Sequence, residues 1–255
     1  MNAAPTTAPI LEVAGLSKNY GETRALDGVS LAFRRGSIHA ILGENGSGKS
    51  TLVKLLAGVV APSGGAIHAD GRRIARFVPA AMAALGLATV FQEVLIAPDR
   101  SVTENVLLGQ DGLLRRRIPR RQRRAAAAAA LARITAAPIE LDAPAGRLPL
   151  ALRQLVVLAR ALARQPRILV LDEATAALDF ADREAVFRTL EGFAQEGRLI
   201  LFISHRMEEV TRLADRISVL RSGLLVATLE RGEADPDRLL ALMAPLTAAA
   251  LRHAP

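Results

Sequence analysis

The sequence predicts an α/β fold whose mainly parallel sheet carries antiparallel β additions and an inserted helical subdomain. Short apolar runs separated by helical patterns predict the parallel sheet, because strands buried on both faces are apolar throughout. β-like segments at 10–16, 28–33, 216–223 and 223–229 look like antiparallel additions. Between about residues 101 and 163 the strand signal disappears and helix-forming residues dominate. The apolar runs are IHAIL (38–42), LATVF (87–91), ILVL (168–171) and LILFIS (199–204).

The length of 255 residues and the hydrophobic content of 51% allow one sizeable core with a smaller subdomain. The start of the chain contains Pro and Thr and suggests a loose tail. We therefore expect the chain to be organised in four parts. These are a flexible N-terminal tail (1–9), an α/β core (10–100 and 164–235), a helical subdomain (101–163) and a C-terminal helix or tail (236–255).

Cysteine is absent from the sequence, which excludes a disulfide framework, a thiol nucleophile and a cysteine-rich metal site. This composition fits a reducing compartment and predicts a cytoplasmic location. The start of the chain has no basic residue before Lys18 and no long apolar run, so it does not resemble a secretory signal. Elsewhere the apolar stretches fall short of the roughly 18 consecutive residues that cross a bilayer. We therefore expect any work at a membrane to be done through a partner.

The formal net charge of +8 is concentrated in the segment RRRIPRRQRR (115–124), which contains seven arginines. Such a patch can bind nucleic acid or anionic lipid. However, no aromatic residue interleaves the arginines, and runs of charge usually face solvent. We favour a solvated surface beside an alanine-rich helix, so nucleic acid is not an expected partner.

A phosphate-binding loop (P-loop) is predicted at residues 43–50. The segment GENGSGKS fits G-x-x-x-x-G-K-[ST], follows the strand predicted at 38–42 and opens the helix TLVKLLAG. Its glycines permit close backbone approach, so that amides and the helix N-terminus face the phosphates. Lys49 would bridge the outer phosphates and Ser50 would bind Mg²⁺, whereas the alternative is a chance glycine turn before a helix. The nucleotide-binding residues expected here are Gly43, Asn45, Gly46, Gly48, Lys49, Ser50 and Thr51.

Two acidic residues follow a buried strand in ILVLDEATAALD (168–179). Open α/β sheets bind their ligands beyond the carboxyl ends of the strands, where Asp172 and Glu173 are expected just past the strand. Asp172 would hold the metal, and Glu173 would polarise a water for in-line attack on a γ-phosphate. Alone, this pattern could be an ordinary acidic loop or helix cap. Its combination with the P-loop favours a catalytic role.

A histidine ends another apolar strand in LILFISHRMEEV (199–210). At a strand end shared with the other motifs, His205 could donate a hydrogen bond to a phosphate oxygen. A lone histidine is more often structural or simply exposed. The spacing alone leaves both interpretations open.

Together, GENGSGKST, Gln92 in VFQE, DEATAALD and ISH resemble the nucleotide-binding subunits of ATP-binding cassette (ABC) transporters, and the resemblance covers essentially residues 10 to 230. It implies a P-loop NTPase core that binds ATP and Mg²⁺. It also implies that Tyr20 stacks on adenine, Gln92 senses Mg²⁺ and the attacking water, Asp179 communicates across a dimer and His205 contacts the γ-phosphate. For Tyr20, an edge-strand aromatic is the alternative.

The segments FQEVLIAPDRSVTENVLLG and FISHRMEEV most resemble the ATPases of bacterial monosaccharide importers, although amino-acid and metal importers share much of these sequence patterns. This resemblance implies transmembrane permease subunits, a second nucleotide-binding domain and, indirectly, a solute-binding protein as partners. It also implies a peripheral location on the cytoplasmic face of the membrane. Motion would pass to the permease through residues 93–106 and the helical subdomain.

The family's LSGGQ signature, which reaches the γ-phosphate on a partner's P-loop, is degenerate here. LPLALRQLVVLARAL aligns with it without gaps, and Leu148, Pro149, Leu150, Ala151 and Leu152 occupy its five positions. Pro149 suits the first turn of a helix, but the serine hydroxyl is lost. A hydrogen bond to a charged group contributes roughly 1.5 to 3 kcal/mol, so this site could be idle. The alternative is that the helix start still cradles phosphate.

The groups that would hold ATP on this chain are intact, whereas the signature that would contact ATP on a partner's P-loop is degenerate. This difference predicts a heteromeric or tandem pair of cassettes with one competent site. One alternative is a regulatory ATP-binding module that dimerises but barely turns over. Another is a soluble ABC ATPase that acts on nucleic acid or ribosomes through its arginine segment. A P-loop kinase is a further alternative, but it would not need DEATAALD together with ISH.

Overall fold

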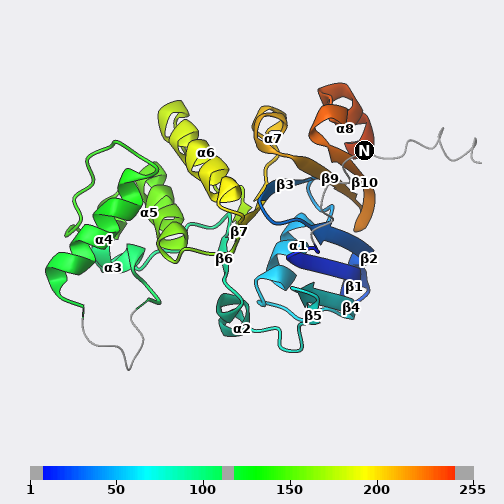
Figure 1. Cartoon of the computed structure of the whole chain (residues 1–255), viewed down its shortest axis with the longest axis horizontal. Helices are drawn as coiled ribbons and strands as arrows, with labels where there is room; N and C mark the ends of the chain where they lie inside the picture. Colours follow the sequence, from blue (N-terminus) through cyan, green and yellow to red (C-terminus); the bar gives the residue numbers. More distant parts are fainter. Residues whose placement is uncertain (1–7, 111–117, 245–255) are drawn as a thin grey trace, which may run out of the picture.

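A computed structural model describes residues 8–110 and 118–244 (Figure 1). Most of the expected N-terminal tail, the first three arginines of the basic segment and the last eleven residues lie outside these ranges. The strands are β1 (Leu11–Tyr20), β2 (Thr23–Phe33), β3 (Ser37–Leu42), β4 (Gly64–Ala69), β5 (Arg72–Arg73), β6 (Leu87–Val90), β7 (Ile168–Asp172), β8 (Leu199–Ile203), β9 (Arg216–Arg221) and β10 (Leu224–Glu230). The helices are α1 (Lys49–Leu56), α2 (Pro79–Ala84), α3 (Val102–Val106), α4 (Arg120–Ala132), α5 (Leu150–Ala163), α6 (Phe180–Gln195), α7 (Met207–Leu213) and α8 (Pro236–Met243), with 3₁₀ turns at Ala145–Arg147 and Arg231–Glu233.

The main sheet has the strand order β10-β9-β3-β8-β7-β6 within the described ranges. The strands from β9 to β6 are parallel, which confirms the mainly parallel sheet. The expectation that 216–223 is an antiparallel addition is wrong, because β9 runs parallel to β3 and only β10 is antiparallel. Parallel strands require a crossover connection, and α7 supplies it between β8 and β9, which lie on either side of β3. Nothing within residues 216–223 reveals that connection.

A smaller antiparallel sheet has the order β2-β1-β4-β5, which confirms the β additions near the front of the chain. Elements β4, β5 and α2 were not predicted from the sequence. Strand β4 begins with two glycines, which have low strand propensity and so do not predict a strand. Their lack of a side chain allows the close approach of another backbone segment. At Gly65, with φ +82°, an added Cβ would lie 2.3 Å from the Gly15 carbonyl oxygen. The close pairing of β1 with β4 therefore depends on a residue that carries no strand signal.

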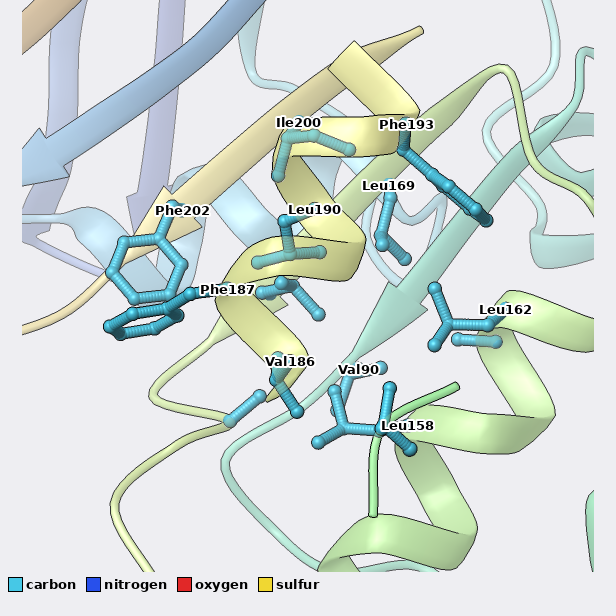
Figure 2. Close-up of a cluster of buried hydrophobic side chains, with 14 of the residues drawn as sticks. Val90, Leu158, Leu162, Leu169, Val186, Phe187, Leu190, Phe193, Ile200 and Phe202 are labelled. Atoms are coloured by element: carbon cyan, nitrogen blue, oxygen red, sulfur yellow. The ribbon is translucent and has the colours of Figure 1, made fainter. Parts of the chain in front are cut away.

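Helices α3, α4 and α5 lie together on one side of the molecule, and α5 contacts the main sheet at β6 (Figure 1). A continuous apolar core joins α5 and α6 to the sheet strands, as the side chains in Figure 2 show. Those side chains include Leu158 and Leu162 of α5, and Val186, Leu190 and Phe193 of α6. Because α5 packs through this core, its first turn is held relative to the strands that carry the site. Across the described residues, no helix has both the length and the apolar character that crossing a bilayer requires.

A polar link ties the segment after Gln92 to the helical elements. The Arg160 guanidinium of α5 donates to the Leu95 and Asn105 carbonyl oxygens, each at 2.7 Å. The Asn105 side chain in turn accepts from the Ala97 amide at 2.8 Å and donates to the Ala97 carbonyl at 2.9 Å. These bonds satisfy backbone groups that have no regular secondary-structure partner. The segment after Gln92 and helix α5 are therefore held against one another.

A fully buried histidine lies in the central strand β3. His39 Nε2 lies 2.8 Å from the Ser218 hydroxyl of β9, which lies 2.8 Å from the Thr228 hydroxyl of β10. Burial, and then the charges of Arg216 and Arg34, lower the pKa of His39 from 6.5 to about 3. The folded protein therefore holds His39 as neutral imidazole, whereas the unfolded chain binds a proton below pH 6.5.

The protein is expected to lose stability between pH 6.5 and pH 3 because of His39. Below pH 6.5 the unfolded chain protonates His39, whereas the folded protein keeps this residue neutral down to about pH 3. The stabilisation from neutral His39 is therefore complete above pH 6.5 and is lost as the pH falls through this window. Between pH 7.5 and pH 5.0 the loss from this residue is about 2 kcal/mol of unfolding free energy. Urea denaturation at the two pH values should show a smaller change for His39→Gln than for the wild type. Equal changes in both proteins would contradict the expectation.

Candidate functional site

A cavity of about 640 Å³ lies where the P-loop meets the ends of β6, β7 and β8. Nearly all of the predicted site residues line it. Gly43 and Asp172 lie outside the lining, and Thr23, Arg24 and Ala25 are lining residues that the sequence analysis missed. Their position directly after Tyr20 and a glycine turn is the signal that could have identified them. The lining comprises Tyr20, Thr23, Arg24, Ala25, Asn45, Gly46, Gly48, Lys49, Ser50, Thr51, Gln92, Glu173 and His205.

The P-loop wraps around the Lys49 ammonium. Lys49 Nζ donates to the Gly43 and Glu44 carbonyl oxygens at 2.7 and 2.8 Å. A Cβ on Gly43 would lie 2.2 Å from the Leu220 carbonyl oxygen, and one on Gly48 would lie 2.6 Å from that of Ala25. Both residues also have positive φ, of +155° and +103°, so glycine is required for the shape of the loop.

Helix α1 begins at Lys49, two residues earlier than predicted, with Gly48 as its N-cap. Gly48 contributes no side-chain cap, and the first turn contains no acidic residue. The first amides of α1 therefore have no side-chain acceptor from their own cap, and Ser50 and Thr51 face the cavity. This arrangement is the one by which helix N-termini bind phosphate.

Lys49 and Asp172 are both buried and carry opposite charges. Burial lowers the pKa of Lys49, while the charges of Glu173, Asp172 and Glu44 oppose this shift. Burial, and then the charge of Glu173, raise the pKa of Asp172 to about 6, against the effect of Lys49 and Lys54. Asp172 is 5% exposed and is the last residue of β7 rather than a residue beyond it.

The oxygen donors of the site suit Mg²⁺. The Asp172 carboxylate lies at the end of β7, and the Ser50 hydroxyl and the Gln92 amide line the cavity beside it. Mg²⁺ prefers such hard oxygen ligands and usually completes its shell with water and substrate phosphates. These residues therefore fit the metal that the sequence motifs predict.

Three predicted catalytic residues meet at Glu173. Gln92 Nε2, just after β6, donates to Glu173 Oε2 at 3.1 Å. His205 Nδ1, just after β8, lies 3.3 Å from Glu173 Oε1. Glu173 itself has φ +50°, a conformation that non-glycine residues rarely adopt. The sheet therefore brings side chains from three separate strand ends to one wall of the cavity.

Tyr20 and Asp179 lie at two different places. Tyr20 ends β1, is 45% exposed and lines the cavity next to the P-loop, with Lys18 Nζ 5.2 Å from its ring centroid. Asp179 is the N-cap of α6, and its carboxylate accepts from the Asp182 amide at 2.8 Å. Tyr20 is therefore part of the cavity lining, whereas Asp179 is outside it.

The signature segment lies apart from the cavity lining. Pro149 is the N-cap of α5 and not a residue of its first turn, which corrects the expectation from the sequence. Leu148 and Leu152 pack against the core, while the Leu150 side chain is 59% exposed. Arg153 donates to the Leu148 carbonyl oxygen at 2.7 Å and so fixes the turn before the helix. The exposed residues of the segment are therefore Pro149 and Leu150, where the family pattern has serine and glycine.

A buried carboxylate behind the site escaped the sequence analysis. Glu209, in the first turn of α7, is 5% exposed and accepts hydrogen bonds from Thr175 and Ser204. These two residues lie in the loops that follow Glu173 and precede His205. Thr175 and Ser204 could have been identified because they lie within the DEATAALD and ISH motifs. Their contact with Glu209 could not, because it depends on how α7 packs.

Comparison with known proteins identifies what this arrangement resembles. A family profile described as "ABC transporter" matches residues 26–176. Ribose import ATP-binding protein RbsA 1 of Mesorhizobium japonicum is 45% identical over 238 residues, which is 93% of this chain and 46% of that protein. Its counterpart in Burkholderia cenocepacia is 42% identical over 250 residues, which is 95% of this chain and 48% of that protein. The chain thus spans about half the length of the curated relatives it matches.

Solved structures show the same fold. A nucleotide-free ATP-binding cassette from an ABC transporter superposes with a TM-score of 0.78 and 26% identity, covering 92% of this chain and 99% of that one. A dimeric ATP-binding cassette in a post-hydrolysis state, bound to ADP and Pi, superposes with a TM-score of 0.79 and 25% identity. That match covers 87% of this chain and 98% of the other.

Proposed function

The chain belongs to the ABC transporter family, and we propose that it is an ATP-binding and ATP-hydrolysing cassette that powers an importer of a simple sugar. The observation that carries the proposal is the convergence of Gln92, Glu173 and His205 on the cavity that the P-loop lines. The similarity to ribose import ATP-binding proteins supports the sugar as the class of solute.

In this proposal the P-loop amides and Lys49 bind the phosphates of ATP, and Tyr20 stacks on the adenine ring. Ser50, Gln92 and Asp172 would hold Mg²⁺, which when bound neutralises charge on the β- and γ-phosphates. Asp172 would have to be deprotonated to act as a ligand, and the burial that raises its pKa opposes this.

Hydrolysis would proceed by in-line attack of water on the γ-phosphorus. The water oxygen forms a bond to phosphorus, the bond from phosphorus to the β–γ bridging oxygen breaks, and ADP leaves with that electron pair. Glu173 would accept the proton of the attacking water. His205 would donate a hydrogen bond to a γ-phosphate oxygen, and Gln92 would orient the water. The contacts of Glu173 with both residues support this division of roles.

Replacing Lys49 with alanine is expected to weaken ATP binding at least about tenfold, because charge-assisted hydrogen bonds to phosphate contribute roughly 1.5 to 3 kcal/mol each. Binding is measured by isothermal titration calorimetry with MgATP. Lys54→Ala is the matched control, because Lys54 is exposed on the same helix and does not line the cavity. Unchanged affinity in Lys49→Ala would contradict the nucleotide site itself.

A permease would dock beside the segment that follows Gln92. A groove of about 200 Å³ lies between this segment and α5, and Phe91, Leu95 and Val157 form part of its lining. The Arg160 link described above joins both walls of the groove. Force from ATP-driven closure could therefore pass from Gln92 to a transmembrane partner on the cytoplasmic face of the membrane. Copurification of the chain with a permease from detergent-solubilised membranes would support this docking.

The second cassette is proposed to differ from this one. In an ABC dimer the γ-phosphate on one P-loop is contacted by the signature of the other subunit, and here that signature presents Leu150 instead of glycine and lacks the serine hydroxyl. The matched relatives are about twice as long as the matched segment, which suits a tandem pair. The ATP site on this chain's P-loop would then be the active one.

A low-turnover regulatory module is the second candidate, because the degenerate signature favours weak hydrolysis in a symmetric dimer. The two functions differ in the role of Glu173. In the transport ATPase the carboxylate is essential for phosphate release, whereas in a regulatory module its replacement changes little.

A further inference from the structure

We propose that Glu209 is a positioning residue that holds the Glu173 loop and the His205 loop in the relative arrangement required for hydrolysis. The inference rests on the proposed ATPase function and extends it to a residue outside the cavity lining. Glu209 lies in the first turn of α7, behind the wall that Glu173 and His205 form.

One carboxylate oxygen of Glu209 joins the two loops. Glu209 Oε2 accepts from the Thr175 hydroxyl and from the Ser204 hydroxyl, both at 2.9 Å. Thr175 lies two residues after Glu173, and Ser204 immediately precedes His205. All three members of the bridge are at most 5% exposed, so water does not compete for these bonds.

The other oxygen anchors the bridge electrostatically. Glu209 Oε1 lies 3.3 Å from Arg206 Nη1 and 3.8 Å from Arg183 Nη1. Arg206 also donates to the Ala176 carbonyl oxygen at 3.2 Å, and its amide donates to the Ser204 hydroxyl at 3.1 Å. A buried carboxylate is tolerated only when it is paired and hydrogen-bonded, and here both conditions are met. Arg206, which compensates the charge of Glu209, therefore also connects the two loops through Ala176 and Ser204.

The bridge matters because the Glu173 backbone and the exposed His205 side chain need support beyond the contacts that Gln92, Glu173 and His205 make with one another. The Glu173 backbone has φ +50°, which must be stabilised from both sides, and its amide donates to the Ile203 carbonyl oxygen at 2.9 Å. The His205 side chain is 58% exposed, so its position depends on the residues next to it in the chain. Thr175 and Ser204 supply those fixed points only while Glu209 accepts from both.

The test compares Glu209→Ala and Glu209→Gln with Glu208→Ala and Glu208→Gln, because Glu208 is exposed on the same helical turn. Hydrogen–deuterium exchange of the isolated chain reports the two loops, at 173–176 and 203–206. Phosphate release is assayed with a complementing copy of the chain that carries Lys49→Ala, Pro149→Ser, Leu150→Gly, Ala151→Gly and Leu152→Gln. That copy offers an intact signature to the P-loop of the tested chain. Its own P-loop lacks the lysine and does not support hydrolysis.

Glu209→Ala is expected to speed exchange in both loops and to lower kcat by about 10- to 100-fold, because small misplacements of catalytic groups are costly. The affinity for ATP should change less than threefold, since no contact of Lys49 involves Glu209. Glu209→Gln keeps an acceptor for both hydroxyls and should lie closer to the wild type. Thr175→Val should loosen mainly the first loop, and Ser204→Ala mainly the second.

Two results would overturn the proposal: unchanged exchange in both loops of Glu209→Ala, or faster exchange with unchanged kcat. A loss of activity that Glu208→Ala shares would overturn it as well. A wild-type chain that binds ATP but releases no phosphate in the mixture would refute the proposed hydrolysis instead. The exchange measurement would still decide in that case whether Glu209 holds the two loops together.

Discussion

Replacing Glu173 with glutamine is expected to lower phosphate release by about 10²- to 10⁴-fold while MgATP still binds. Proton transfer by a positioned carboxylate contributes on this scale, and an amide cannot accept the proton of the attacking water. Glutamine has the same shape and can still accept the hydrogen bond from Gln92 Nε2 that reaches Glu173 at 3.1 Å. The substitution therefore removes the base and leaves the geometry in place.

The measurement is steady-state phosphate release in the mixture with the complementing copy, accompanied by calorimetric titration of MgATP. Glu208→Gln makes the same chemical change at an exposed position outside the cavity lining and should behave like the wild type. If Glu173→Gln released phosphate at a rate near that of the wild type, the regulatory interpretation would replace the transport ATPase.

The second large effect is expected from complementation between two copies of the chain. The wild-type protein alone should be nearly idle, because every composite site in its symmetric dimer would use residues 148–152. Mixing it with the complementing copy should raise phosphate release by at least about 10- to 100-fold. This range corresponds to one restored hydrogen bond to the γ-phosphate, at roughly 1.5 to 3 kcal/mol.

The controls isolate the signature as the cause. The complementing copy alone should be inactive, since Lys49→Ala removes its only P-loop lysine. A copy with Lys49→Ala and the native signature should fail to activate the wild type. Strong, cooperative turnover by the wild type alone would contradict the heteromeric pair and show that the start of α5 cradles phosphate without a serine or glycine.

The P-loop and the mainly parallel sheet were predicted from the sequence, whereas part of the strand arrangement was not. The P-loop could be located because its shape depends on glycines that nothing else can replace, as the 2.2 Å and 2.6 Å approaches at Gly43 and Gly48 show. The apolar runs located the parallel strands, because strands buried on both faces have no polar alternation. By contrast, the direction of β9 and the presence of β4 were missed, since both depend on connections and close backbone contacts rather than on local composition.

The structure also corrected the interpretation of individual residues. Pro149 caps α5 instead of opening its first turn, because its ψ of 157° is extended rather than helical. Leu148 and Leu152 are partly buried against the core, whereas Leu150 is exposed. Residues 148–152 are all apolar, so their sequence does not indicate which side chains face the core.

The sequence by itself identified the candidate groups for binding and hydrolysing a nucleotide, because the P-loop, the acidic pair and the strand-end histidine are local patterns with a defined chemistry. Only the tertiary structure decided that Gln92, Glu173 and His205 share one wall, and that Glu209 joins the two loops behind it. Those contacts connect residues that are 5 to 81 positions apart in the chain. Their geometry is set by the order of the parallel strands and by the packing of α7, which no single segment of the sequence encodes.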